Sequence, residues 1–345
     1  MSELTERQKK LLILVIRDYI DTVQPVGSQN LVDRYHMDMS SATVRNELAA
    51  LSVMGYLSQP HTSAGRIPTE DGYRYFVSQL VHQVELPSAI QHTITHQFFQ
   101  ARHDIEQWMH LSASILAHQS QGVSLITAPH AEMAHFKHLE LISTQGRQVL
   151  MVLVLLGGEV SQQILTLAEP VLQGELSQTA ERLNQVCIGS SADEIAALVM
   201  SVDAMEKDIL ILVLQDMRTT DGCVSGEIYF DGLTNVLAEP EFTDSDDARR
   251  ALHLIEERSL LQDILSRTIM NSNVGGVQVL IGGEGTWEEL RQCSMILARY
   301  GVPGMLTGTL GVLGPMRMPY ARTIPTVRFM ADLLSDLVTD TIYGE

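Results

Sequence analysis

The sequence predicts an α+β multidomain protein that opens with a winged helix-turn-helix and in which one of the later domains is inserted into another. Three observations support this fold class. The chain of 345 residues is longer than one hydrophobic core usually supports. Its first eighty residues follow the order helix, helix, turn, helix, loop. Farther along, two stretches with the two-residue period of strands flank a mainly helical block.

The first predicted helix covers residues 5–22, with Thr5 in the N-cap position. Its apolar residues recur at helical spacing and are Leu11, Leu12, Val15, Ile16, Tyr19 and Ile20. Pro25 and Gly27 end this helix, and Ser28 caps a second, short one. The two helices are the expected start of a helix-turn-helix.

A third helix is predicted to begin at Ser40 or Ser41, either of which suits the N-cap, and to end at Met54 before Gly55. The stretch 60–68 is rich in turn-forming residues and predicts a loop between short extended pieces. A further helix follows. This order is typical of a winged helix-turn-helix, to which residues 1–82 are assigned.

Beyond this unit the predicted elements alternate between helices and strands. Residues 83–120 are predicted to be a connecting segment with one long helix from Pro87 to about Gln119. The first group of predicted strands comprises 123–126, 139–142, 148–156 and 161–167. Residues 195–270 are mainly helical in pattern apart from a strand at 226–230, and the run 209–214 fits either a helix or a buried strand. The last elements are a strand at 277–281, a helix at 286–300, a strand at 307–313 and a helix at 320–339.

The charge of the chain is unevenly distributed. The net charge is −19, but residues 1–80 carry 8 basic and 9 acidic side chains, whereas the remainder carries 15 and 33. The acidity therefore belongs to the later domains. A nearly neutral N-terminal unit can still bind DNA if its basic side chains gather on one face.

The sequence carries no signal for secretion or membrane insertion. The N-terminus lacks the basic and apolar regions of a signal peptide, and the longest apolar run, 149–156, is too short to cross a bilayer. Cys187, Cys223 and Cys293 lack metal-ligand spacing and suit small buried side chains in a reducing compartment. We therefore expect a soluble, cytoplasmic protein.

The predicted helix 41–54 has two contrasting faces. Val44, Leu48 and Leu51 lie in one narrow arc that must face a core. The opposite arc is small and polar and holds Ala42, Asn46, Ala49 and Ala50, with Thr43 and Arg45 on its flanks. Small residues let a helix approach a major groove, and Arg45 and Asn46 can make paired hydrogen bonds to guanine and adenine. Ser41 and Thr43, near the helix N-terminus, can meet phosphates, although an ordinary surface helix has the same pattern.

The loop that follows carries polar side chains that suit the wing of such a domain. They are His61, Thr62, Ser63 and Arg66. Arg66 can enter a minor groove or pair with a phosphate. The alternative is a solvated hairpin tip.

No other group of residues in the sequence predicts a metal site, a cofactor site or a catalytic site. His92, His96, His103 and His110 fall on one stripe of the predicted helix, which raises a metal-binding or pH-sensing role. The stripe lies opposite the apolar face, so a solvated outer face is favoured. We predict no metal site, no cofactor and no catalytic motif, and hence no enzyme.

Several short segments of the chain are distinctive. The most specific is Gln59-Pro60-His61-Thr62-Ser63-Ala64-Gly65-Arg66-Ile67-Pro68-Thr69. The others are 25–28, 41–48, 72–75, 230–235, 240–242, 281–284 and 314–320. In these segments the chain strongly resembles the HrcA family of heat-inducible transcription repressors. They run from end to end, so the resemblance covers the whole chain.

The resemblance implies three parts. They are the winged-helix domain, a GAF-like domain built from residues 121–194 and 271–345, and a mainly helical dimerisation domain inserted at 195–270. It also favours helix for 209–214.

The resemblance further implies that a homodimer binds a double-stranded inverted-repeat operator, called CIRCE, ahead of chaperone genes and blocks transcription. In that family the GroEL chaperonin helps the repressor reach its active form, and heat shock diverts the chaperonin to unfolded clients. The main alternative is a ligand-responsive regulator, because a GAF-like domain can hold a small molecule.

Overall fold

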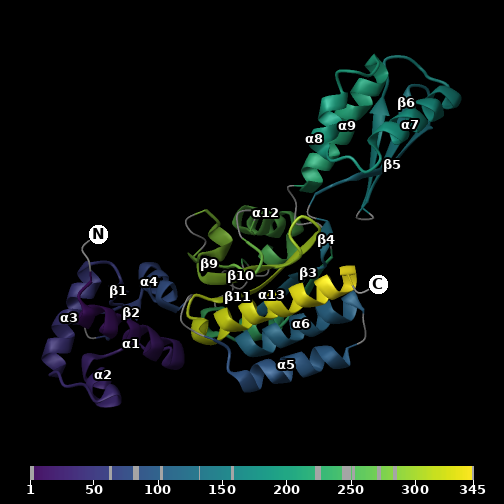
Figure 1. Cartoon of the computed structure of the whole chain (residues 1–345). Coiled ribbons are helices and arrows are strands. Elements are labelled where there is room, and N and C mark those ends of the chain that lie inside the picture. Colours follow the sequence, from purple (N-terminus) through teal and green to yellow (C-terminus); the bar gives the residue numbers. More distant parts are fainter. Residues whose placement is uncertain are drawn as a thin grey trace.

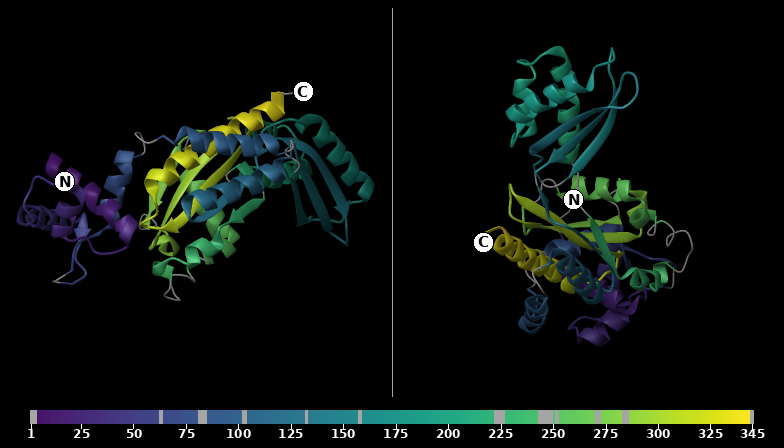
Figure 2. Two further views of the ribbon diagram at one scale, coloured as in Figure 1. Left: turned by 90° about the horizontal axis from the view of Figure 1, so that it is seen from below. Right: turned by 90° about the vertical axis from the view of Figure 1, so that its right-hand side faces the viewer.

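The computed structural model has three parts: an N-terminal unit, a central unit and an insert that projects from it (Figure 1). It describes residues 4–61, 64–80, 85–101, 104–131, 133–156, 159–221, 227–242, 250, 253–269, 273–282 and 286–343. The N-terminal unit and the insert lie at opposite ends of the central unit (Figure 2).

The N-terminal unit packs four helices around a small hairpin. Its elements are α1 (Glu6–Thr22), α2 (Ser28–Tyr35), α3 (Ser41–Val53), β1 (Leu57–Ser58), β2 (Ile67–Pro68) and α4 (Glu70–Leu80). A capping box between Thr5 and Gln8 starts α1, and Val23 ends it in the left-handed conformation at φ 55°. The predicted order of elements in this unit is confirmed.

The central unit is built on an antiparallel sheet of order β8-β3-β11-β10-β9, with β4 beside β11. The strands are β3 (Val123–Thr127), β4 (His130–Ala131), β8 (Ile228–Asp231), β9 (Val277–Ile281), β10 (Cys293–Gly301) and β11 (Leu306–Pro315). The helices are α5 (Ser88–Gln100), α6 (Ile105–Ser120), α10 (Leu233–Leu237), α12 (Arg258–Ile269) and α13 (Tyr320–Tyr343), and the 3₁₀ turns are η1 (Pro240–Phe242) and η3 (Glu288–Leu290).

Both faces of this sheet are covered, because neighbouring strand residues enter different cores. Ile126 and Ile296 pack on the side of α6 and α13, whereas Leu125 and Leu297 pack on the side of α12. The side with α6 and α13 also shares its core with the N-terminal unit. The central unit therefore has two hydrophobic layers, one of which continues into the neighbouring unit.

The insert has a hydrophobic core of its own. Three strands form the meander β5-β6-β7, and three helices cover one face of it. The elements are β5 (Phe136–Ser143), β6 (Gln148–Leu155), β7 (Val160–Thr166), α7 (Gln173–Cys187), α8 (Ala192–Leu198) and α9 (Ala204–Asp221). The run 209–214 lies in α9, so the helix that the resemblance favoured is confirmed.

The predicted bounds of the insertion are wrong. The separate core draws on residues 134–217 rather than on 195–270, and the predicted strands 139–142, 148–156 and 161–167 belong to the insert and not to the central sheet. The described residues between 228 and 269 return to the central unit, where β8 pairs with β3. A two-residue period identifies a strand but carries no information on which sheet it joins, which explains the error.

Two predicted helices are also wrong. The segment 87–119 is two helices, α5 and α6, and Asp104 begins the second by accepting a hydrogen bond from the Glu106 amide at 3.0 Å. Residues 293–300, predicted as helix, lie in strand β10, which pairs with β9 and β11. Nearly every residue of that strand is buried, so its sequence lacks the alternation that marks a half-exposed strand.

Because α5 and α6 are separate helices, the histidines that were predicted to share one helical stripe do not form a single stripe. His92 and His96 are exposed on α5, whereas His110 on α6 lies beside Glu106 at 4.0 Å and against the Tyr229 ring. His103 lies outside the described residues. Within the described ranges, no three His, Cys, Asp or Glu side chains are grouped to hold a metal ion.

None of the helices in the described residues is long and apolar enough to cross a membrane.

Candidate nucleic-acid interface

The helix α3 begins with a well-formed cap. The Ser40 hydroxyl accepts a hydrogen bond from the Thr43 amide at 3.2 Å, and the two hydroxyl oxygens lie 2.9 Å apart. The sequence allowed either Ser40 or Ser41 as the N-cap, and the structure shows that it is Ser40. Ser41 and Thr43 are half-buried in the first turn, where the positive end of the helix dipole favours an anion.

The two faces of α3 are divided as predicted. Val44, Leu48 and Leu51 are buried, whereas Arg45 and Asn46 are exposed. Neither Arg45 nor Asn46 has a polar partner among the described residues. Their donors and acceptors are therefore available to a ligand that approaches the outer face of the helix.

Polar contacts with α1 hold α3 and α2 in place. Glu47 on α3 accepts hydrogen bonds from Gln8 at 3.1 Å and from Arg7 at 3.4 Å. On the next helix, Arg34 pairs with Asp18. These contacts engage acidic groups of the unit that would otherwise repel a phosphate, and they fix the position of α3 on α1.

The hairpin after α3 is reinforced by an isolated β-bridge to the segment before α2. Leu57 pairs with Pro68 and Ser58 with Ile67. In addition, Val26 and Arg66 exchange two backbone hydrogen bonds of 2.8 and 2.9 Å. The hairpin is therefore anchored to the segment between α1 and α2.

The predicted side chains of this hairpin are only partly described. His61 is exposed, and the half-buried Arg66 has no side-chain polar partner among the described residues. The Gln59 side chain donates to the Ala64 carbonyl at 2.9 Å and braces the loop. Thr62 and Ser63 lie outside the described residues.

Gly65 is a determinant of this hairpin that sequence reasoning missed. A Cβ atom at this position would lie 2.5 Å from the carbonyl carbon and oxygen of Val26. Only glycine therefore allows the two backbones to pair at this point. The one signal in the sequence was the position of Gly65 within the segment that most specifically resembles the family.

We expect Gly65→Ala to destabilise the N-terminal unit by about 1–3 kcal/mol, because the obstructing atoms belong to the backbone and cannot rotate away. Thermal unfolding followed by circular dichroism measures the effect. Gly174→Ala is the matched control, since a Cβ atom there meets nothing within 4 Å and the change should be neutral or slightly stabilising. Equal stability of the two variants would show that the hairpin does not need the close approach.

The comparisons with a family model and with related sequences identify the same family, and together they cover nearly the whole chain. A model of the HrcA protein C terminal domain matches residues 106–324. The chain is similar to the heat-inducible transcription repressor HrcA of Roseiflexus castenholzii, with 41% identity over 351 residues that cover 99% of this chain and 96% of the relative. It is also 42% identical over 350 residues to the repressor of the same name from Herpetosiphon aurantiacus, covering 99% and 97% of the two chains.

One solved structure shares the fold. It is the crystal structure of a hypothetical protein at 2.2 Å resolution, which superimposes with a TM-score of 0.61 and covers 98% of this chain and 100% of its own. The sequence identity is 23%, so this likeness concerns the fold alone.

Proposed function

The chain belongs to the HrcA family of heat-inducible transcription repressors, and from this premise we infer that it represses heat-shock genes by binding their operator DNA. The operator is a CIRCE-type inverted repeat ahead of chaperone genes. The observation that carries this proposal is the outer face of α3, where Arg45 and Asn46 are exposed and have no polar partner among the described residues, while the opposite face is buried. A helix of this kind can enter a major groove and read base edges.

The three units take separate roles in this proposal. The N-terminal unit is the winged-helix domain, the central unit is the GAF-like domain, and the insert is the dimerisation domain. Arg45 and Asn46 read bases, and Ser41 and Thr43 contact phosphates near the N-terminus of α3. On the wing, His61, Thr62, Ser63 and Arg66 contact the backbone or the minor groove.

The outer face of the insert supports self-association. In the register of β5-β6-β7, Ile142, Leu150 and Ile164 lie in one row, and Val154 pairs with Val160 in a second row on the same face. Ile164 is 68% exposed and Val160 is 56% exposed. The helices cover only the other face of the sheet, so an apolar surface remains for a partner.

The edges of the same sheet differ in a way that supports the same proposal. Along β5, the Asn184 side chain bonds the amide and carbonyl of Leu139, and Gln173 bonds the amide of Ser143 and the carbonyl of Leu141. Along β7, none of the described side chains caps the outward backbone groups in this manner. An uncapped edge beside an apolar face is a natural site for a second copy.

Two-fold symmetry links this dimer to its operator. A dimer presents its two α3 helices in equivalent positions, and such a pair matches an inverted repeat with fixed spacing. In this proposal GroEL raises the fraction of active repressor and heat shock lowers it, because unfolded clients compete for the chaperonin.

A fluorescence-anisotropy titration tests the proposed function. The probe is a CIRCE-type inverted-repeat duplex, and a scrambled duplex is the competitor, with and without GroEL and ATP. We expect tight, competitor-resistant binding by the dimer and a larger active fraction with the chaperonin. No gain from GroEL would contradict the proposed regulation, and no specific binding in either condition would contradict the operator.

A further inference from the structure

Three segments that resemble the family lie away from the DNA-facing residues, yet they meet in space. They are residues 72–75 on α4, Ile281 and Gly282 at the end of β9, and residues 314–320, which run from the end of β11 to the first residue of α13. The Arg74 guanidinium donates a hydrogen bond to the Ile281 carbonyl at 3.2 Å. The rings of Tyr73 and Tyr320 pack at 6.1 Å between centroids. This contact, which we call the α4 joint, connects the N-terminal unit to the central unit.

The α4 joint is apolar inside and braced by charge outside. Tyr73 is 2% exposed and Tyr320 is fully buried, and both belong to the one core that runs through the two units. Arg74 also pairs with Glu70 at 3.1 Å and with Asp71 at 2.8 Å, which orients its guanidinium toward Ile281. A shared core with an oriented hydrogen bond resists rotation far more than a flexible linker does.

Gly282 completes the joint on the side of the central unit. It adopts a left-handed conformation at φ +65°, and a Cβ atom there would lie 2.6–2.9 Å from the Glu70 carboxylate. Any other residue would be strained in this conformation and would push Glu70 away from Arg74. Gly282 therefore leaves room for the Glu70 side chain of α4.

The same helix is tied to the end of α3. The Thr69 hydroxyl donates to the Gly55 carbonyl at 2.6 Å, and the Thr69 amide donates to the Tyr56 carbonyl at 3.2 Å. Gly72 lies so close to the Tyr56 carbonyl that a Cβ atom would overlap it. The orientation of α3 thus follows the orientation of α4 on the central unit.

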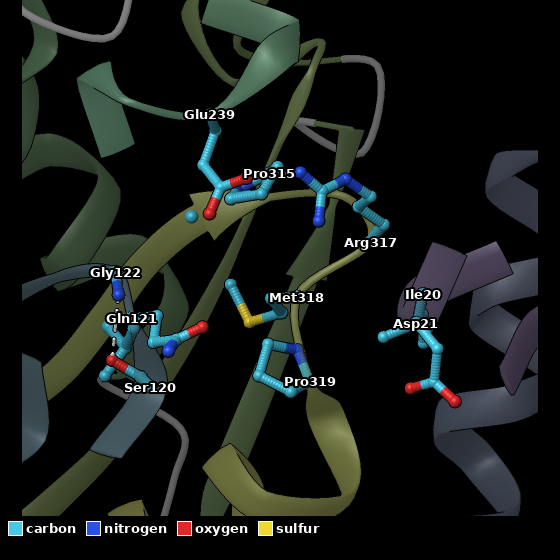
Figure 3. A pocket seen from close by; sticks show the side chains of 12 residues that line it. Ile20, Asp21, Ser120, Gln121, Gly122, Glu239, Pro315, Arg317, Met318 and Pro319 are labelled. Atoms are coloured by element: carbon cyan, nitrogen blue, oxygen red, sulfur yellow. Dashed lines mark hydrogen bonds and ion pairs between the residues drawn. The ribbon is translucent and has the colours of Figure 1, made fainter. Parts of the chain in front are cut away.

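The two units meet less closely on the other side of the N-terminal unit. A cavity of about 260 Å³ separates Ile20 and Asp21 of α1 from Arg317, Met318 and Pro319 (Figure 3). Arg317 turns toward Glu239, with which it pairs, and not toward Asp21. Because this side is open, the angle between the units depends on the α4 joint.

We propose that the α4 joint fixes the angle at which each copy presents α3, with Arg74 and Gly282 as positioning residues for operator recognition. This inference rests on the proposed function. In a dimer, a fixed angle sets the separation of the two α3 helices and hence the spacing of half-sites that can be bound together. A loosened joint lowers the effective concentration of the second α3 at its half-site but tolerates more spacings.

The test compares full-length Arg74→Ala with Arg74→Lys, which keeps the charge and one donor, and with the surface control Arg267→Ala on α12. The probes are inverted-repeat duplexes with the natural spacer and with spacers altered by one or two base pairs. We expect Arg74→Ala to bind the natural spacer roughly tenfold more weakly and to discriminate less among spacers. Arg74→Lys should recover part of the discrimination, and Arg267→Ala should behave as the unmodified protein.

A second variant guards against simple misfolding. Gly282→Ala changes the other side of the joint, and unfolding and dimerisation are measured for every variant. Unchanged spacer discrimination in well-folded Arg74→Ala and Gly282→Ala, or tighter binding to the natural spacer, would overturn the inference. If the unmodified protein binds none of these duplexes, the proposed operator fails instead.

Discussion

Replacing Arg45 by alanine is expected to weaken specific operator binding by about 5- to 150-fold while leaving the fold intact. The range corresponds to the roughly 1–3 kcal/mol that a bidentate contact to guanine contributes. Arg45 is exposed on α3, and its removal breaks no hydrogen bond or ion pair among the described residues. Anisotropy titrations against the inverted repeat and a scrambled duplex measure both affinity and discrimination.

Two control variants separate base reading from general attraction to DNA. Arg45→Lys keeps the charge but loses the paired donors of the guanidinium, so affinity should recover more than discrimination. Arg291→Ala removes an exposed arginine of the central unit and should change neither. Full discrimination in Arg45→Ala would remove this residue from base readout and leave Asn46 as the candidate.

The N-terminal unit was predictable because its signals are local. The caps at Thr5 and at Ser40 or Ser41 and the spacing of buried residues on α1 and α3 lie within a few residues of the elements they define. The division of α3 into a buried and an exposed side followed from the same periodicity. For such segments the sequence contains most of what determines the local structure.

The central unit was less predictable because its signals are distant. β3 pairs with β8 across the whole insert, and nothing local reveals that partnership. β10 is buried on both faces, so its apolar run fits a helix as well as a strand. The predictions failed where tertiary contacts, rather than the spacing of apolar residues along the sequence, determine whether a segment is a helix or a strand and which strand it pairs with.

The same distinction applies within the candidate site. Arg45 and Asn46 could be chosen from one helix, whereas the need for Gly65 arises from Val26 and the role of Arg74 arises from Ile281. The two residues of each pair are far apart in the sequence, so the contact that explains each residue exists only in the folded chain. Resemblance to the family marked both segments without explaining them.

Placing an aspartate at Ile164 is expected to shift the protein from dimer to monomer and to weaken operator binding by about 10²- to 10⁴-fold. Ile164 is 68% exposed in a single chain, so the substitution costs little in the monomer. In a dimer that covers this face, the carboxylate would lose its water within an apolar contact. A monomer also loses the gain from binding two linked half-sites, which sets the size of the expected loss.

Sedimentation analysis and titration of the same samples measure this prediction. Met200→Asp is the matched control, because Met200 is 84% exposed in the same insert but lies between α8 and α9 rather than on the outer face of the sheet. The control should remain dimeric and bind as the unmodified protein does. If Ile164→Asp also remained dimeric, the copies would associate through another surface, whereas a monomer with undiminished affinity would show that one α3 suffices. Only joint loss of the dimer and of tight binding fits a repressor whose specificity depends on two recognition helices held by the insert.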